Sequence, residues 1–176
     1  MAKRSRIQIN EDEKKILREL EINSKEKTEK LANKLGFSRQ KIMKIIKKLE
    51  NNKKIWGYTA IVDDDNIDRK RFFILLKRLH KPAVKENIDN KVKRNLNESA
   101  RKNAIQIEDC YYVHGAFDWL MCITAKDIGQ VKRFCDSFNK MFNGTYISDI
   151  QILDTLFSIE RNGFDNPNGE ELKEFF

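Results

Sequence analysis

The run from Ser38 to Glu50 narrows the possible folds of this chain more than any other part of the sequence. Ser38 is a favourable N-cap, and neither Gly nor Pro interrupts the residues that follow, so the run predicts a helix. At about 100° per residue, four apolar side chains fall on one side of this helix: Ile42, Ile45, Ile46 and Leu49. The opposite side is polar and cationic, with Gln40, Lys44 and Lys47 at its centre and Lys41 and Lys48 on one flank. One face must be buried, and the other is left as a cationic surface.

A cationic helix face is most often only a solvated surface, and a binding role has to be weighed against this alternative. The stretch before Ser38 argues for the binding role. Thr28–Leu35 has the pattern of a short amphipathic helix, and Gly36 can adopt the left-handed conformation that ends a helix. Two helices joined by such a tight turn form a helix-turn-helix, whose second helix enters the major groove of double-stranded DNA.

The charge of the chain is distributed unevenly. Residues 1–62 contain 17 Lys and Arg against 8 Asp and Glu, whereas residues 63–176 contain 18 against 19, so +9 and −1 make up the net +8. All of the net positive charge lies in the part with the helix pair, and a polyanion is the expected partner of that part alone. A chain of 176 residues can hold one medium domain or two small ones, and the uneven charge favours two. We therefore expect two domains with different partners.

Several classes of protein are not indicated by the sequence. It has no apolar run long enough to span a membrane and no apolar signal-peptide core, so a cytoplasmic location is expected. The three cysteines are odd in number and lack CxxC spacing, and the two histidines stand far apart, so buried thiols and ordinary histidines are favoured over metal or redox chemistry. These residues are Cys110, Cys122, Cys135, His80 and His114. No Gly-rich phosphate loop and no nucleophile motif is present. We expect no metal, no cofactor and no enzymatic activity.

The N-terminal part has the elements of a three-helix core. Residues 1–9 form a short basic arm, and Asn10 with Glu13 makes a capping box that predicts a first helix over residues 11–21. The apolar stripe of this helix can pack against the two later helices: Ile16, Leu17 and Leu20. Residues 55–62 are rich in aromatic and β-branched types, which predicts a strand or wing leaving the helical unit.

A polar break follows at Asp63-Asp64-Asp65-Asn66, and we interpret it as the domain boundary. A Ca²⁺-binding loop is the sharper alternative, but the D-x-D-x-D-G spacing and the closing Glu of such a loop are missing. The expected organisation is a helix-turn-helix domain over residues 1–62, a linker over 63–70, a second domain over 71–162 and a tail over 163–176.

The sequence of the second domain predicts a succession of strands and helices. In chain order these are a strand at Phe72–Leu76, a helix over about 84–103, strands over about 105–114 and 117–125, a helix over about 128–142 and a strand over about 146–159. This order is that of a ferredoxin-like βαββαβ fold. The chain as a whole is therefore expected to be α+β.

Several of the predicted strands are apolar on both faces, most clearly at Phe72–Leu76 and Leu120–Ile123. Two helices can cover only one face of a four-stranded sheet, so the other face is expected to meet another protein surface. A homodimer held by the second domain is the simplest arrangement.

Two motifs, in this order and separation, resemble those of the Lrp/AsnC family, the feast/famine transcription regulators. They are Ile55-Trp56-Gly57-Tyr58-Thr59-Ala60 after the helix-turn-helix and Val113-His114-Gly115-Ala116-Phe117-Asp118-Trp119-Leu120 at the predicted hairpin. The resemblance covers about residues 8–163. It implies a winged helix-turn-helix, a C-terminal ligand-sensing domain, dimers that associate into tetramers or octamers, and regulation by an amino acid or related metabolite. The chain departs from the family pattern at 81–103, about two helical turns longer than usual, and in the tail from Asn162.

The turn with His114, Gly115 and Asp118 is the candidate effector-binding site. From the residues alone a structural role is an equally good explanation, since Gly115 would supply a positive φ and Asp118 would hydrogen-bond turn amides. The resemblance favours the binding role, because in this family the G-x-x-D turn lies between sensor domains and lines the amino-acid pocket. Gly115 would let a ligand carboxylate reach backbone N–H groups, and Asp118 would pair with its α-ammonium group.

The candidate DNA-binding residues are those of the cationic helix. The residues expected to face base edges or the neighbouring sugar-phosphate are Ser38, Arg39, Gln40 and Lys44. Those expected to neutralise phosphates are Lys41, Lys47 and Lys48, with Lys3, Arg4 and Arg6 of the basic arm as further contacts. A dimer would present two such helices about 34 Å apart, or a multiple of that, so the operator should be pseudo-palindromic.

Two functions are compatible with these features. The first is a sequence-specific DNA-binding transcription regulator whose C-terminal domain dimerises and senses an amino acid or related metabolite. The alternative is a metabolite-binding regulatory module that acts through protein contacts without specific DNA binding. The uneven charge distribution favours the first.

Overall fold

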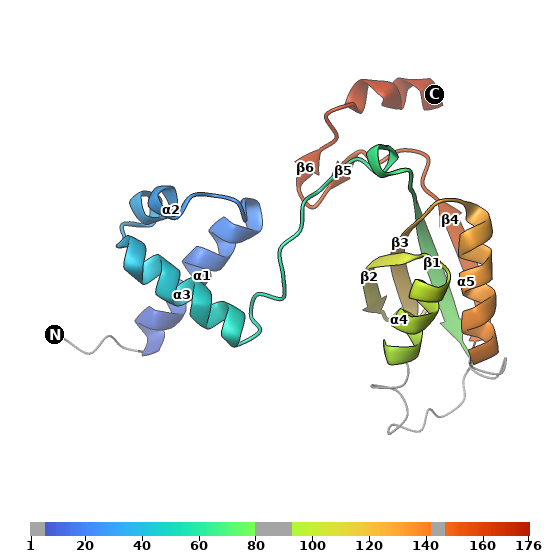
Figure 1. Cartoon of the computed structure of the whole chain (residues 1–176), viewed down its shortest axis with the longest axis horizontal. Coiled ribbons are helices and arrows are strands. Elements are labelled where there is room, and N and C mark those ends of the chain that lie inside the picture. The colour runs from blue at the N-terminus through green and yellow to red at the C-terminus, as the bar shows by residue number, and fades with distance from the viewer. Residues whose placement is uncertain (1–5, 80–92, 142–146) are drawn as a thin grey trace. The chain divides into compact units, whose positions relative to one another are not determined.

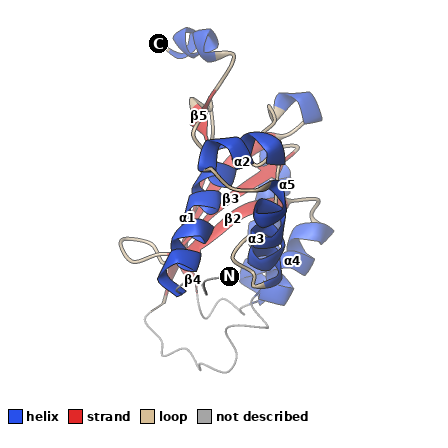
Figure 2. Ribbon diagram, turned by 90° about the vertical axis from the view of Figure 1, so that its left-hand side faces the viewer, coloured by secondary structure: helices blue, strands red, loops and turns tan. Residues whose placement is uncertain are grey.

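The structure, a computed structural model, describes residues 6–79, 93–141 and 147–176 (Figure 1). The chain divides into two compact units, Met1–Ile61 and Val62–Phe176. The described elements of the first unit are all helical, and all of the described strands belong to the second. Figure 2 draws the helices in blue and the strands in red. No described helix combines the length and the apolar composition that a membrane-spanning segment requires.

Three helices build the N-terminal unit: α1 (Arg6–Ile22), α2 (Thr28–Leu35) and α3 (Arg39–Asn51). Their apolar stripes meet in one core, as predicted, and its buried members are Ile16, Leu20, Leu31, Ala32, Ile42 and Leu49. Further apolar side chains pack partly buried against this core, among them Leu17, Leu35, Ile45 and Ile46. The face of α3 that was predicted to be buried is therefore the buried one.

Helix α1 begins earlier than predicted. The expected start at residue 11 with Asn10 in a capping box is wrong, because Asn10 lies inside the helix, which runs from Arg6. Neither Gly nor Pro stands between these two residues, and Gln8 Nε2 donates to Asp12 Oδ1 at 3.3 Å across one helical turn. Part of the predicted basic arm is thus helical, and its residues 1–5 lie outside the described residues.

A tight turn joins α2 to α3. Gly36 has φ 64° and ψ 34°, and this left-handed conformation ends α2 as predicted. Phe37 N then donates to Ala32 O at 2.9 Å, and Ser38 caps the next helix by accepting a hydrogen bond from Lys41 N at 3.2 Å. The helix-turn-helix expected from the sequence is formed, with α3 as its second helix.

The segment after α3 does not form the predicted strand or wing over residues 55–62. Lys54 N still donates to Leu49 O at 2.9 Å, and Ile55 packs partly buried against the helical core. From Trp56 onward no described segment of the chain pairs with this stretch, and a strand needs such a partner for its backbone groups. Trp56 is 95% exposed.

The second unit contains a four-stranded antiparallel sheet in the order β2-β3-β1-β4. Its strands are β1 (Lys70–Arg78), β2 (Gln106–Tyr112), β3 (Trp119–Ala125) and β4 (Ile147–Asp154). Helices α4 (Lys93–Lys102) and α5 (Ile128–Met141) cover one face of this sheet (Figure 1). The order along the chain and across the sheet is that of the predicted ferredoxin-like fold.

Two predicted elements of this unit differ in extent. Of the long helix predicted over 84–103, the described part is α4, and residues 84–92 lie outside the described residues. The last strand was predicted to reach residue 159 but ends at Asp154. One more hydrogen bond joins the chain to β1, from Thr155 N to Arg71 O at 3.1 Å, and the chain leaves the sheet at the exposed Leu156.

Both faces of the sheet carry apolar side chains, as predicted. The face under α4 and α5 holds the core of the unit, whose largest members include Phe72, Ile74, Met121, Ile123 and Phe134. The opposite face, called the open face below, carries half-buried Phe73, Leu75 and Leu120, with Tyr111 50% and Leu153 49% exposed. An apolar surface is therefore left on the side away from the helices.

The chain ends in a hairpin and a short helix. Strands β5 (Glu160–Arg161) and β6 (Phe164–Asp165) are joined by Asn162 and Gly163, whose φ values of 51° and 80° are those of a type I′ turn. The 3₁₀ helix η4 (Gly169–Phe175) follows. An Asn-Gly pair between two short runs is the sequence signal for such a hairpin, and the prediction of a plain tail missed it.

Candidate functional site

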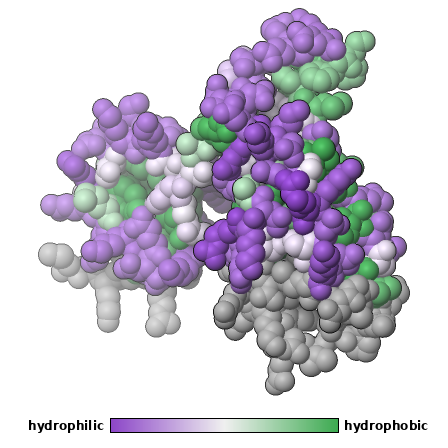
Figure 3. All heavy atoms as spheres, turned by 45° about the vertical axis from the view of Figure 1, so that its right-hand side comes forward, coloured by the Kyte–Doolittle hydropathy of each residue, from purple (hydrophilic) through white to green (hydrophobic). Residues whose placement is uncertain are grey.

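The exposed face of α3 is the first candidate site. Gln40, Lys44 and Lys47 are exposed on it, and neither lysine takes part in an ion pair among the described residues. Hydrophilic residues, drawn in purple, cover much of the face of this unit that Figure 3 shows. The helix thus presents two uncompensated ammonium groups beside one side-chain amide.

Lys41, on the flank of α3, has a different environment. Its Nζ lies 2.6 Å from Oδ2 of Asp12, whose side chain is only 4% exposed. The same ammonium group lies 3.2 Å from the centre of the Phe37 ring, which adds a cation–π contact. The charge of Lys41 therefore compensates a buried carboxylate of α1 and is less available to a partner outside the unit.

Lys48 and Arg39 are also paired inside the unit. Glu13, buried on α1, accepts hydrogen bonds from Lys48 Nζ and Lys54 Nζ, each at 2.7 Å. These two bonds lower the pKa of the Glu13 carboxyl group. Arg39 Nη1 lies 2.9 Å from Glu29 Oε1 in a largely exposed pair, which water and salt screen. The predicted cationic residues of α3 thus differ in how much charge they offer to DNA.

The sequence-based prediction missed the acidic partners of these lysines. Asp12, Ile16 and Leu20 recur at steps of four, so spacing alone places Asp12 on the stripe of α1 that faces the core. A buried carboxylate needs a compensating cation, and the lysine-rich helix is the available source. This was the signal that could have assigned Lys41 a structural role.

The turn predicted to bind an effector joins β2 to β3. His114 and Gly115 are exposed in it, and Asp118 is half-buried at its end. The expectation that Gly115 supplies a positive φ is wrong, since the described glycines with positive φ are Gly36 and Gly163. A Cβ atom added at Gly115 would meet nothing within 4 Å. The structure brings the three predicted residues into one turn but gives Gly115 no conformational role there.

Asp118 is engaged by the end of β1. Its Oδ2 accepts a hydrogen bond from Arg78 N at 2.8 Å, and its Oδ1 accepts one from Arg78 Nε at 3.3 Å. The backbone N of Asp118 donates to Leu76 O at 2.9 Å. Asp118 thus has a structural contact with the end of β1, which the sequence did not predict, and a ligand ammonium group would have to share this carboxylate with Arg78.

Two further residues beside this turn were not predicted. Arg78 Nη2 donates to Tyr112 Oη at 2.6 Å, and its guanidinium carbon lies 5.1 Å from the centre of the same ring. The rings of Tyr112 and Trp119 meet edge to face at 5.7 Å. A partly exposed guanidinium beside aromatic rings suits a carboxylate ligand. Its signal in the sequence is a basic residue that ends the apolar run of β1.

No metal site is seen within the described ranges, where no three His, Cys, Asp or Glu side chains are grouped suitably. His80 lies outside these ranges. The thiols of Cys110, Cys122 and Cys135 are free, and the last two are buried. Burial raises the pKa of Cys135 to about 11 and also raises that of Cys122. Both buried groups are therefore neutral thiols of low reactivity near neutral pH.

Known proteins similar in sequence are regulators. The proline dehydrogenase transcriptional activator of Rhodobacter capsulatus is 25% identical over 127 residues, which are 71% of this chain and 77% of that protein. The leucine-responsive regulatory protein of Haemophilus influenzae is 28% identical over 121 residues, which are 68% of each chain. No protein-family model matches the chain.

A solved structure shares the fold. The feast or famine regulatory protein of M. tuberculosis, complexed with L-methionine, superposes with a TM-score of 0.63 at 15% identity. The match covers 84% of this chain and 92% of that one. Identity at this level shows the fold alone. The fold and the two sequence relatives agree with the resemblance that the two sequence motifs indicate.

Lys41 and Lys44 should respond differently to the same substitution. Lys41→Met leaves the buried Asp12 carboxylate without its lysine, so the free energy of unfolding should fall by about 2 kcal/mol or more. Lys44→Met, on the exposed face of the same helix, should change it by less than about 0.5 kcal/mol. Urea denaturation followed by the helical circular dichroism signal measures both values. Equal losses would contradict the separation of structural and exposed lysines.

Proposed function

We propose that this chain, a relative of the Lrp/AsnC transcription regulators, binds double-stranded DNA sequence-specifically through α3 and regulates transcription. The observation that carries the proposal is the exposed side of a helix-turn-helix on which Lys44 and Lys47 have no ion-pair partner among the described residues. The same unit holds all of the net positive charge, which suits a polyanionic partner. The sequence relatives are named as regulators, so the proposal is for a regulator and not for an enzyme.

The residues predicted to contact DNA are expected to contribute unequally to binding. The direct contacts come from the exposed side of α3, namely Gln40, Lys44 and Lys47. Ser38 and Arg39 lie where the helix begins, so they meet the sugar-phosphate beside the groove. Lys41 and Lys48 contribute less, because buried acids of α1 already compensate their charges.

Substitutions on the exposed side of α3 test the DNA proposal by gel shift against DNA upstream of the protein's own gene. The double variant Lys44→Glu/Lys47→Glu should lose binding, because two cations facing DNA become anions. Lys47→Ala should weaken binding to all sequences alike and reduce the salt slope by about one unit, whereas Gln40→Ala should relax preference at one position.

A matched control for charge is the double variant Lys132→Glu/Lys140→Glu, which makes the same change on exposed positions of α5. It should bind the operator as the wild type does. Unchanged binding by Lys44→Glu/Lys47→Glu would mean that α3 is not the DNA-contacting helix. The alternative function, a metabolite-binding module acting through protein contacts, would be supported if the wild type bound no fragment but was stabilised by a metabolite.

The open face of the sheet is the proposed dimer interface. Its half-buried Phe73, Leu75 and Leu120 lie beside the more exposed Tyr111 and Leu153. An apolar surface of this kind on a sheet typically meets another protein surface, and a second copy of the chain would bury the same residues from both sides. Dimerisation places two copies of α3 on one DNA molecule, as a pseudo-palindromic operator requires.

Leu153→Glu should convert the dimer to a monomer, because each interface would then bury two unpaired carboxylates. Light scattering on the full-length protein measures the mass, expected to be that of two chains or a multiple for the wild type and of one chain for the variant. Ile128→Glu, at an exposed apolar position where α5 begins, is the control and should keep the wild-type mass. A monomeric wild type would refute the interface.

An amino acid is the proposed effector, bound at the turn with His114, Gly115 and Asp118. The related fold complexed with L-methionine supports this ligand class. Asp118 would hold the ligand's ammonium group, and the neighbouring Arg78 guanidinium would attract its carboxylate. Such a ligand changes the arrangement of two subunits only as far as it binds one arrangement better than the other.

Asp118→Asn should abolish stabilisation by the effector, because it removes the charge while one side-chain oxygen can still accept from Arg78 N. Thermal-shift measurements with each of the twenty amino acids identify the ligand, which at 100 times its Kd should stabilise the wild type by about 2.7 kcal/mol. Asp136→Asn, exposed on α5, is the control. A ligand that stabilised Asp118→Asn and wild type equally would leave the turn with a structural role only.

A further inference from the structure

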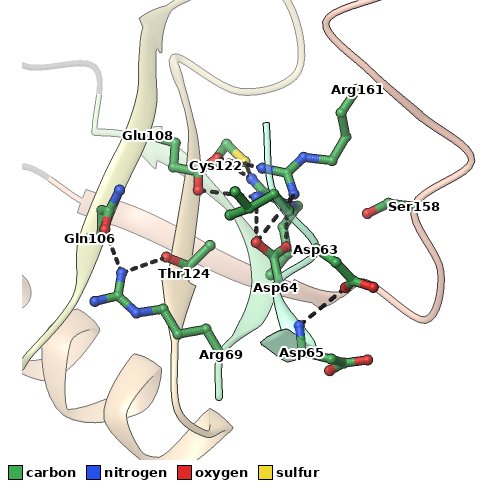
Figure 4. Close-up of polar contacts among 12 residues, drawn as sticks. Asp63, Asp64, Asp65, Arg69, Gln106, Glu108, Cys122, Thr124, Ser158 and Arg161 are labelled. Carbon is green, nitrogen blue, oxygen red and sulfur yellow. Dashed lines mark hydrogen bonds and ion pairs between the residues drawn. The ribbon is translucent and has the colours of Figure 1, made fainter. Parts of the chain in front are cut away.

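An ionic network built around the buried Arg71 lies on the open face of the sheet (Figure 4). Arg71 of β1 donates to both carboxylate oxygens of Asp64, from Nε at 2.9 Å and from Nη2 at 3.0 Å. The same guanidinium donates to both oxygens of Glu108 on β2 and, at 3.0 Å, to Sγ of Cys122 on β3. Burial opposes the charge of Arg71, but the bonds to Glu108 and Asp64 outweigh it and raise the pKa of the guanidinium. Arg71 is therefore permanently charged.

Arg161 joins this network from the C-terminal hairpin. Its Nη1 donates to Val62 O at 2.7 Å and to Asp64 Oδ1 at 3.2 Å. Its Nη2 donates to Glu108 Oε2 at 3.4 Å. Two guanidinium groups thus share two carboxylates, and that of Arg161 also holds a backbone carbonyl. Figure 4 shows Arg161 beside Asp64 and Glu108.

The hairpin that carries Arg161 is itself fixed. Its type I′ turn follows directly at Asn162-Gly163 and determines where β5 and β6 pair. Asn166 N donates to Ile159 O at 2.9 Å, and Asn166 Nδ2 donates to Ser158 O at 2.8 Å. Arg161 is therefore presented by a closed hairpin and not by a free tail.

The network holds the start of the second unit before the sheet begins. Asp64 O accepts from Arg69 N at 3.0 Å across the 3₁₀ helix η1 (Asp65–Ile67). Arg69 in turn donates to Gln106 and, at 3.3 Å, to Thr124 Oγ1. Residues 62–69 are thus folded against the sheet, although their position between the two units would equally suit a free connection.

Arg71 and Arg161 have different roles in this arrangement. Arg71 is buried and pairs the sheet with Asp64, whereas Arg161 also binds Val62, the first residue of the unit. The Arg161 side chain is 22% exposed, and its removal leaves Arg71 with both carboxylates, so no buried charge is uncovered. Without Arg161 the sheet should stay folded and Arg71 should still hold Asp64, while Val62 and Asp63 before it are released.

We propose that Arg161 is a positioning residue that sets the length of the connection between α3 and the dimerising sheet, and thereby the half-site spacing that a dimer accepts. This inference rests on the proposed function. Without Arg161, Asp64 stays bound to Arg71, so the released residues are Val62 and Asp63, which at about 3.3 Å each would lengthen the connection by up to roughly 7 Å. That is the length of about two base pairs, in a half-site separation of about 34 Å, or about 10 base pairs. A short connection discriminates between spacings, and a long one tolerates several.

The first test is hydrogen exchange on four full-length proteins: wild type, Arg161→Gln, Arg161→Lys and the control Arg101→Gln. Arg101 is exposed at the end of α4 and forms no ion pair among the described residues. The amides of Asp65 and Asn66, which donate to Asp63, should exchange several-fold faster in Arg161→Gln, to an intermediate extent in Arg161→Lys, and at the wild-type rate in the control. Unchanged exchange in β1 and β3 shows that the sheet remains folded.

The second test measures binding to duplexes that carry two copies of a bound half-site, with the spacing changed in steps of one base pair. The wild type should bind its best spacing about tenfold more tightly than one that differs by two base pairs, and Arg161→Gln should reduce this ratio to about threefold or less. Affinity for a single half-site should not change. A merely structural role would lower all of these affinities together and leave the ratio unaltered.

Unchanged exchange of the Asp65 and Asn66 amides in Arg161→Gln would overturn the inference. Faster exchange with an unaltered spacing ratio would overturn the role in half-site selection. If the wild type bound no DNA, the proposed function and the spacing role would fail together, and the exchange experiment would still decide whether Arg161 holds the connection.

Discussion

The burial of one face of α3 against α1 and α2 is the interaction on which the N-terminal unit depends. Ile42 and Leu49 are fully buried, and the helical period then determines which residues point outward. Gln40, Lys44 and Lys47 are exposed for this reason and not because of any contact of their own. The chemistry offered to a polyanion is therefore set by apolar residues on the opposite side of the helix.

The same packing carries charge into the interior. Asp12 and Glu13 are brought inside by α1, and Lys41, Lys48 and Lys54 compensate them. A count of lysines on α3 thus overstates the charge that a partner would meet. In the second unit a buried charge is compensated in the same way, since Arg71 forms ion pairs with two carboxylates. In both units ion pairs therefore join separate elements: α1 to α3 in the first unit, and β1 to β2 and to Asp64 in the second.

Features with a local or periodic signal could be predicted from the sequence, including the left-handed Gly36, the Ser38 cap and the strand order of the sheet. The absent wing could not, because the composition around Trp56 suits a strand but does not say whether a partner lies beside it. The candidate sites depend on such pairing even more. Asp118 meets Arg78 because β1 pairs with β3 in one register, and no spacing along the chain encodes that contact.

The two tryptophans of the chain lie in contrasting surroundings. Trp56 is almost fully hydrated in the stretch after α3, whereas Trp119 is half-buried edge to face against Tyr112, next to the turn with Asp118. Intrinsic fluorescence therefore has two separable sources. From these exposures, emission from Trp56 should be red-shifted, open to quenching by iodide and sensitive to events in the connecting stretch. Emission from Trp119 should be shielded and sensitive to events at the sheet, so each unit would carry its own optical reporter.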